Sequence, residues 1–137
     1  MAVRLYTVEE ARALLPEIIP VVEALRDAFV ELRALQATVA AGKRGASGDG
    51  NLLANPWEKD PESRVETLNR SARAAVERLA EWGVEVKDPE RGLIDFYSRR
   101  EGEVVYLCYL LGEPDVAWWH TLGGGFAARQ RLDPAAG

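Results

Sequence analysis

The chain has 137 residues, a length that fits one domain, and we expect residues 1–137 to form a single domain. Hydrophobic residues make up 47% of the chain and charged residues 28%, which is typical of a folded protein and excludes intrinsic disorder. The formal net charge of -5 argues against a nucleic-acid partner, because a basic surface supplies most of the affinity for nucleic acid.

The sequence favours a cytoplasmic protein without a membrane partner. Its one cysteine, Cys108, excludes an intramolecular disulfide and suits a reducing compartment. Glu9 and Glu10 precede any long apolar run, so the N-terminal residues do not have the pattern of a secretory signal. The longest apolar run, at residues 104–112, is too short to span a bilayer.

The first predicted helix begins at Thr7, which can form a capping box with Glu10, each side chain satisfying a free backbone amide. Apolar residues then recur every seven positions and form a broad apolar face. Pro16 and Pro20 interrupt this helix, since each removes a backbone donor and clashes with the preceding turn. We therefore predict a long helix with a kink near residues 12–20.

A second amphipathic helix is predicted to begin at Asp60 and Pro61, an N-cap followed by proline, and to end at Gly83. Residues 41–59 between the two helices are rich in glycine and small polar residues and predict a flexible loop. Two helices joined in this way pack most simply as an antiparallel hairpin, over residues 7–83.

The pattern after Gly83 predicts an antiparallel β-meander over residues 84–122. Segments rich in β-branched and aromatic residues alternate with the turn segments KDPERG, SRREGE and GEPD, which gives three or four strands. A glycine-rich tail follows at residues 123–137. The predicted fold class is therefore α+β, with the helical hairpin packed on one face of the meander.

The helices also predict an oligomer. The first would be about 50 Å long at roughly 1.5 Å per residue, whereas a compact domain of this size has a radius of gyration of only about 14 Å. Either the prolines fold this helix back, or the hairpin projects from the domain and packs against a second copy, and we favour the second. We therefore expect a homodimer that forms through the helices.

Strand alternation predicts which side chains share the face opposite the helices. Placing Leu110 opposite Val116 sets Cys108 against Trp118 and Tyr106 against His120. Placing Tyr97 opposite Val104 sets Asp95 against Tyr106. This register aligns Asp95, Tyr106 and His120 in one row across three strands, and the helices would cover the other face. That other face carries Ile94, Phe96, Val105, Leu107, Tyr109, Ala117 and Trp119.

The chain contains, in this order, the segments YTVEEARALLPEI, GVEVKDPERGLIDF, YLCYLLGE, WWH and GFAARQ. Together they resemble the small bacterial family named domain of unknown function 2203, DUF2203. Tyr109 and Tyr97 depart from its pattern, which has tryptophan and commonly proline there. The resemblance implies a fold and a candidate site but no reaction. The matching positions are Gly92, Leu93, Asp95, Phe96, Leu107, Cys108, Gly112, Glu113, Trp119, His120, Gly125, Phe126 and Arg129.

These patterns favour a small-molecule-binding or metal-binding protein with its site on the polar and aromatic face of the sheet. His120 and Asp95 are the predicted metal ligands, and Cys108, Glu103 or Glu113 are possible further donors. Zinc and iron, as divalent ions, accept such nitrogen, oxygen and sulfur donors. The candidate ligand-binding residues are Asp95, Tyr106, Cys108, Glu113, Trp118, His120 and Arg129.

Other interpretations remain open from the sequence. The arginines at 99, 100, 129 and 131, near the glycines at 123–125, suggest a site for a small anionic ligand, because guanidinium groups suit carboxylate and phosphate. Alternatively, the polar cluster only stabilises the fold, and the protein is a non-catalytic oligomeric structural or interaction module. A third interpretation is an enzyme that uses Cys108 and His120, since a cysteine nucleophile needs a basic neighbour.

Overall fold

The computed structural model describes residues 3–45 and 60–132, and it has the predicted α+β fold. Two helices, α1 (Val8–Gly45) and α2 (Pro61–Glu81), precede all the strands. The strands are β1 (Val84–Asp88), β2 (Leu93–Arg100), β3 (Glu103–Leu110), β4 (Trp118–Thr121) and β5 (Gln130–Arg131). A short 3₁₀ helix, η2 (Phe126–Ala128), lies between β4 and β5. Residues 46–59 of the predicted loop and 133–137 of the predicted tail lie outside the described residues.

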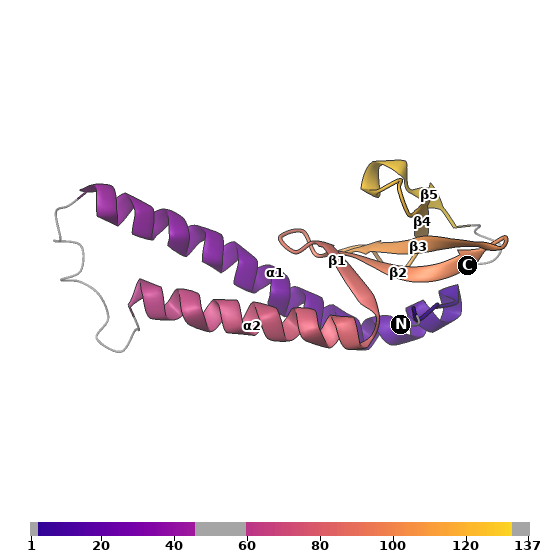
Figure 1. Cartoon of the computed structure of the whole chain (residues 1–137), viewed down its shortest axis with the longest axis horizontal. Coiled ribbons are helices and arrows are strands. Elements are labelled where there is room, and N and C mark those ends of the chain that lie inside the picture. Colours follow the sequence, from indigo (N-terminus) through magenta and orange to yellow (C-terminus); the bar gives the residue numbers. More distant parts are fainter. Residues whose placement is uncertain (1–2, 46–59, 133–137) are drawn as a thin grey trace.

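Helix α1 begins with the predicted capping box. The Thr7 amide donates to Glu10 Oε1 at 2.8 Å, and the Glu10 amide donates to Thr7 Oγ1 at 3.0 Å. Pro16 and Pro20 both lie inside the helix, and Figure 1 shows that α1 changes direction between its first turns and the long segment beside α2. Proline explains such a bend, because it removes a hydrogen bond and crowds the preceding turn. The helix also continues through residues 41–45, which were predicted as loop.

Helix α2 is capped as predicted and forms an antiparallel hairpin with α1 (Figure 1). The Ser63 amide donates to Asp60 Oδ1 at 2.9 Å, and Pro61 is the first helical residue. The apolar positions that face each other across the two helices are buried, as expected because they recur at helical spacing along one side of each helix. Neither α1 nor α2 offers, within its described residues, an apolar stretch that could cross a membrane. The buried helical positions include Ala11, Leu15, Ile18, Val22, Leu25, Ala28, Leu32, Leu68, Ala72, Ala75 and Leu79.

The five strands form one antiparallel sheet in the order β1-β2-β3-β4-β5. The predicted register between β3 and β4 is confirmed, with Cys108 opposite Trp118 and Tyr106 opposite His120. The fifth strand, β5, lies in the tail, where no strand was predicted.

The predicted register between β2 and β3 is wrong by two residues. Tyr97 pairs with Tyr106 instead of Val104, and Asp95 pairs with Cys108 instead of Tyr106. The cause is a tight turn in which Glu101 and Gly102 have φ values of 51° and 83°, as in the two-residue hairpin turns that match strand twist. Because the shift is even, every side chain keeps its predicted face.

The two faces of the sheet are covered by different parts of the chain. Helix α1 lies beneath one face, and the segment that carries η2 and β5 lies above the other (Figure 1). On the helical side, Ile94, Phe96, Leu107 and Tyr109 join the hydrophobic core, as predicted from strand alternation. The opposite face therefore holds its polar side chains between the sheet and the C-terminal segment.

Candidate functional site

A buried aspartate and the one histidine of the chain contact each other on this opposite face. His120 Nε2 lies 3.0 Å from Asp95 Oδ2, and only 1% of Asp95 and 3% of His120 are exposed. Asp95 comes from β2 and His120 from β4, so the contact runs diagonally across β3. The predicted meeting of these two residues therefore occurs, although the predicted row that led to it does not.

The hydrogen bonds of His120 place one proton between the two side chains. His120 Nδ1 lies 2.7 Å from the Thr121 carbonyl oxygen, which can only accept, so Nδ1 carries a hydrogen. Nε2 then either accepts from a protonated Asp95 or donates to an ionised one. Both arrangements keep the pair neutral as a whole, which lowers the cost of burying it.

The carboxyl group of Asp95 is only partly satisfied. Burial raises its pKa, against the opposing effects of the His120 charge and of the Cys108 thiol beside it. Its second oxygen, Oδ1, is buried without a hydrogen-bond partner among the described residues. A buried polar atom without a partner costs about 1–3 kcal/mol, and this oxygen has room to accept a further bond.

Cys108 lies opposite Asp95 in the sheet and is fully buried. Burial raises the pKa of its thiol to about 12, and the charge of Asp95 adds to this effect, while Arg129 acts to lower it. A thiol with this pKa is a poor nucleophile, because the thiolate is the reactive form. The site therefore gives little support to the interpretation that Cys108 is a catalytic nucleophile.

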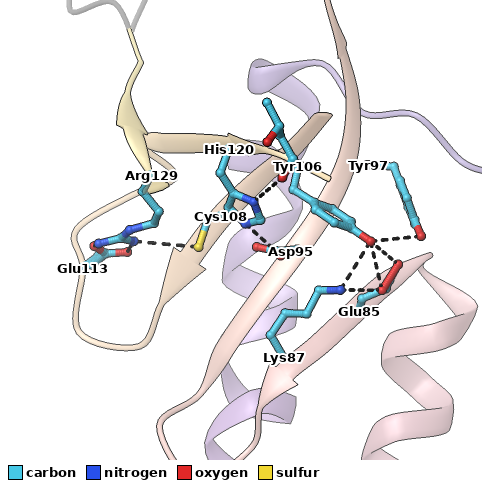
Figure 2. A network of polar contacts seen from close by, with 10 residues as sticks. Glu85, Lys87, Asp95, Tyr97, Tyr106, Cys108, Glu113, His120 and Arg129 are labelled. Carbon is cyan, nitrogen blue, oxygen red and sulfur yellow. Dashed lines mark hydrogen bonds and ion pairs between the residues drawn. The ribbon is translucent and has the colours of Figure 1, made fainter. Parts of the chain in front are cut away.

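Asp95, Cys108 and His120 form the candidate metal centre. One ligand atom from each of the three residues lies within 4.8 Å of the other two, and all three residues are buried. They come from three adjacent strands, β2, β3 and β4. Figure 2 shows the three side chains pointing toward one another.

Arg129 and Glu113 form an ion pair at the cysteine side of this cluster (Figure 2). The guanidinium Nη1 lies 3.1 Å from Glu113 Oε1 and 3.9 Å from Cys108 Sγ, and Nη2 lies 3.0 Å from Glu113 Oε2. The rings of Trp118 and Phe126 lie 4.7 Å and 4.1 Å from the guanidinium carbon. Four of the predicted ligand-binding residues are thus neighbours: Cys108, Glu113, Trp118 and Arg129.

A second set of polar side chains surrounds the Tyr106 hydroxyl on the histidine side of the cluster. The hydroxyl contacts Glu85 at 3.0 Å, Tyr97 at 3.2 Å and Lys87 at 3.3 Å. Burial tends to raise the pKa of Glu85, but hydrogen bonds from Tyr97, Lys87 and Tyr106 outweigh it and lower that pKa. The Tyr106 ring lies 5.3 Å from the His120 ring and so walls the cluster on this side.

A pocket of about 200 Å³ opens beside Asp95 and His120. It combines polar groups with apolar walls, and the C-terminal segment supplies part of its rim. Asp95 and His120 line this pocket, and Cys108 does not. Its lining residues are Lys87, Leu93, Asp95, Tyr106, His120, Leu122, Gly123, Gly125 and Phe126.

Sequence reasoning missed several residues around the cluster. Glu85 and Lys87 could have been found, because strand alternation along VEVK places them on the face opposite Val84 and Val86. Leu122 could not, since its position depends on how the glycine-rich segment folds back over the sheet. Phe126 matches the family pattern but was not assigned to the site. Glu103, named as a further metal donor, is exposed at the start of β3 and is not in the cluster.

Of the four arginines suggested for an anion site, Arg100 lies apart from Arg129 and Arg131. Arg100 stacks on Trp119, which packs against the core on the helical side of the sheet. Arg129 and Arg131 both contact Trp118, and Arg129 is paired with Glu113. The glycine-rich segment instead contributes to the pocket beside Lys87.

The fold and site define an α+β protein whose five-stranded sheet buries a polar Asp-Cys-His cluster under its C-terminal segment. A family model described as "Uncharacterized conserved protein (DUF2203)" matches residues 4–132, and the chain belongs to this family. Comparison with curated proteins and with solved structures finds no match.

His120→Phe is expected to destabilise the metal-free protein at neutral pH by about 3–5 kcal/mol, the usual cost of removing one partner of a buried ion pair. The variant leaves Asp95 buried without a positive partner, so its already raised pKa rises further. A carboxyl group with a raised folded-state pKa is stabilised by protonation. The deficit should therefore shrink as the pH falls through that pKa.

Urea unfolding across a pH series, with a chelator present, measures this effect. Glu81→Gln is the control, because it breaks the exposed Arg78–Glu81 pair and should cost less than about 0.5 kcal/mol. A His120→Phe deficit that stays constant from neutral to acid pH would contradict the account of the buried pair.

Proposed function

We propose that this protein binds a divalent metal ion, Zn²⁺ or Fe²⁺, through Asp95, Cys108 and His120. The carrying observation is that one nitrogen, one oxygen and one sulfur donor lie within 4.8 Å of one another in a buried cluster. Both metals accept this combination of imidazole, carboxylate and thiolate.

The donor distances suit an ion after small movements. Zinc binds nitrogen and oxygen at about 2.0–2.1 Å and sulfur at about 2.3 Å, so tetrahedral ligands lie roughly 3.3–3.6 Å from one another. The present separation of His120 Nε2 from Asp95 Oδ2 is 3.0 Å, slightly shorter than this. A metal ion would replace the proton that the pair now shares, and it would also provide a partner for a carboxyl group that now has one unsatisfied oxygen.

The bond from His120 Nδ1 to the Thr121 carbonyl supports this assignment. Metal-bound histidines usually donate their second ring N–H to a carbonyl or carboxylate, which fixes the tautomer and the orientation of the ring. The Thr121 carbonyl, 2.7 Å away, accepts this bond and leaves Nε2 facing Asp95. The histidine is therefore preorganised to give Nε2 to a metal.

Three protein ligands leave a coordination position free, as in metal sites that take up a small molecule. The pocket of about 200 Å³ lies beside Asp95 and His120 and suits such a ligand. We propose a small anion as its class, because Lys87 lines the pocket and its ammonium has three N–H donors, of which Glu85 at 2.9 Å and the Tyr106 hydroxyl at 3.3 Å take two.

The metal proposal predicts that Zn²⁺ stabilises the chelator-treated protein. At a free metal concentration 100-fold above the dissociation constant, the gain is about 2.7 kcal/mol, because only the folded state assembles the three ligands. Thermal unfolding with and without Zn²⁺ measures it. Cys108→Ser, Asp95→Asn and His120→Gln should each lose most of the gain.

Glu103→Gln is the matched control for this experiment. It removes a negative charge from an exposed position of the same sheet and should keep the full gain. Zinc that stabilises the protein and Cys108→Ser equally would place the metal elsewhere. An absence of any stabilisation would overturn the proposed function.

The proposed anion is tested by titrating acetate into the zinc-loaded protein in a calorimeter. Acetate should bind, and Lys87→Met should weaken the binding several-fold, because the substitution removes an N–H donor from the pocket lining and leaves Glu85 without its positive partner. Arg73→Met, an equal loss of charge on α2, is the control. Equal acetate affinities in the Lys87 variant and the parent protein would contradict this role of Lys87.

An oligomeric interaction module is the second candidate, and the shape of the helical hairpin favours it. The hairpin extends well beyond the sheet (Figure 1), and Val30 and Val76 are exposed on it. A second copy that packs on the hairpin would bury these valines. The molecular mass of the protein in solution should then be twice that of one chain. Val30→Glu should reduce it to the mass of one chain, because it places a charge in the interface. A monomeric mass at high protein concentration would exclude the homodimer.

A further inference from the structure

We propose that Arg129 is a positioning residue that tunes the thiolate of Cys108 in the metal-bound protein. The inference rests on the proposed metal site and concerns its regulation by a neighbouring side chain. Arg129 Nη1 directs an N–H at Cys108 Sγ over 3.9 Å, and neither residue lines the pocket. This contact would withdraw electron density from a metal-bound thiolate.

The guanidinium is held firmly where it faces the sulfur. Glu113 binds it through both carboxylate oxygens, at 3.1 Å and 3.0 Å, and itself accepts from the Leu110 amide at 2.8 Å. Trp118 and Phe126 contact the same group through their rings. Five N–H donors in a rigid plane allow one guanidinium to bind a carboxylate and a sulfur together, which a lysine ammonium cannot reproduce.

The charge balance favours this arrangement near a cation. Glu113 neutralises Arg129, so the guanidinium adds little net repulsion to a metal ion at the cluster, while its N–H still points at the sulfur. Hydrogen bonds to metal-bound sulfur change the electronic properties of the centre, including the redox potentials of iron and copper sites. Arg129 would thus set how strongly Cys108 donates electrons to the metal.

Cobalt substitution tests this inference, because Co²⁺ replaces Zn²⁺ and gives a sulfur-to-metal charge-transfer band. Arg129→Met keeps an apolar stem between the two rings but removes the N–H donor. The thiolate then becomes more electron-rich, and the charge-transfer band should move to lower energy. The visible d–d bands, which report the coordination geometry, should keep their positions. Arg131→Met, at a residue that stacks on Trp118, is the matched control and should leave both sets of bands unchanged.

Glu113→Gln provides a second variant in case Arg129→Met does not fold. It keeps Arg129 and an acceptor for the Leu110 amide but removes the carboxylate charge that neutralises the guanidinium, so the positive charge acts more strongly on the thiolate and the band should move in the opposite direction, to higher energy. If neither variant moves the charge-transfer band, the role proposed for Arg129 is wrong, while the proposed metal site stands. If the unmodified protein shows no such band with Co²⁺, the proposed metal function fails and this inference fails with it.

Discussion

The polar side of this protein depends on the contact between Asp95 and His120. Two ionisable side chains can be buried here because one proton, shared between Nε2 and Oδ2, keeps the pair neutral, and the Thr121 carbonyl fixes which nitrogen faces the carboxylate. Without that compensation, an isolated buried charge would cost several kcal/mol. The shared proton also marks a position where a metal ion would meet the same two atoms.

The rest of the fold keeps this contact away from water. The helical hairpin covers one face of the sheet, and apolar side chains of the two layers form a common core. The C-terminal segment covers the other face and adds Phe126, Arg129 and a two-residue strand. Both faces of a short meander are thus covered, and segments of the same chain enclose its polar cluster.

The sequence predicted the fold class because its signals are local. A capping box at Thr7, an N-cap at Asp60 and strand alternation after Gly83 each need only a few neighbouring residues to be recognised, and each is found in the structure. Alternation also assigned the correct face to Asp95 and His120. The exact pairing failed at the turn after β2, since turn geometry rather than hydrophobic pattern sets the register there. Contacts of the C-terminal segment were not predictable, because its glycines leave many paths open and tertiary packing selects one.

X-ray absorption at the zinc edge tests the central claim most directly, because it counts the ligands around the metal in the loaded protein. The account predicts one sulfur at about 2.3 Å together with nitrogen and oxygen ligands at about 2.0–2.1 Å, and loss of the sulfur in Cys108→Ser. A coordination shell that contains only nitrogen and oxygen would contradict this prediction, because Cys108 would then not be a ligand.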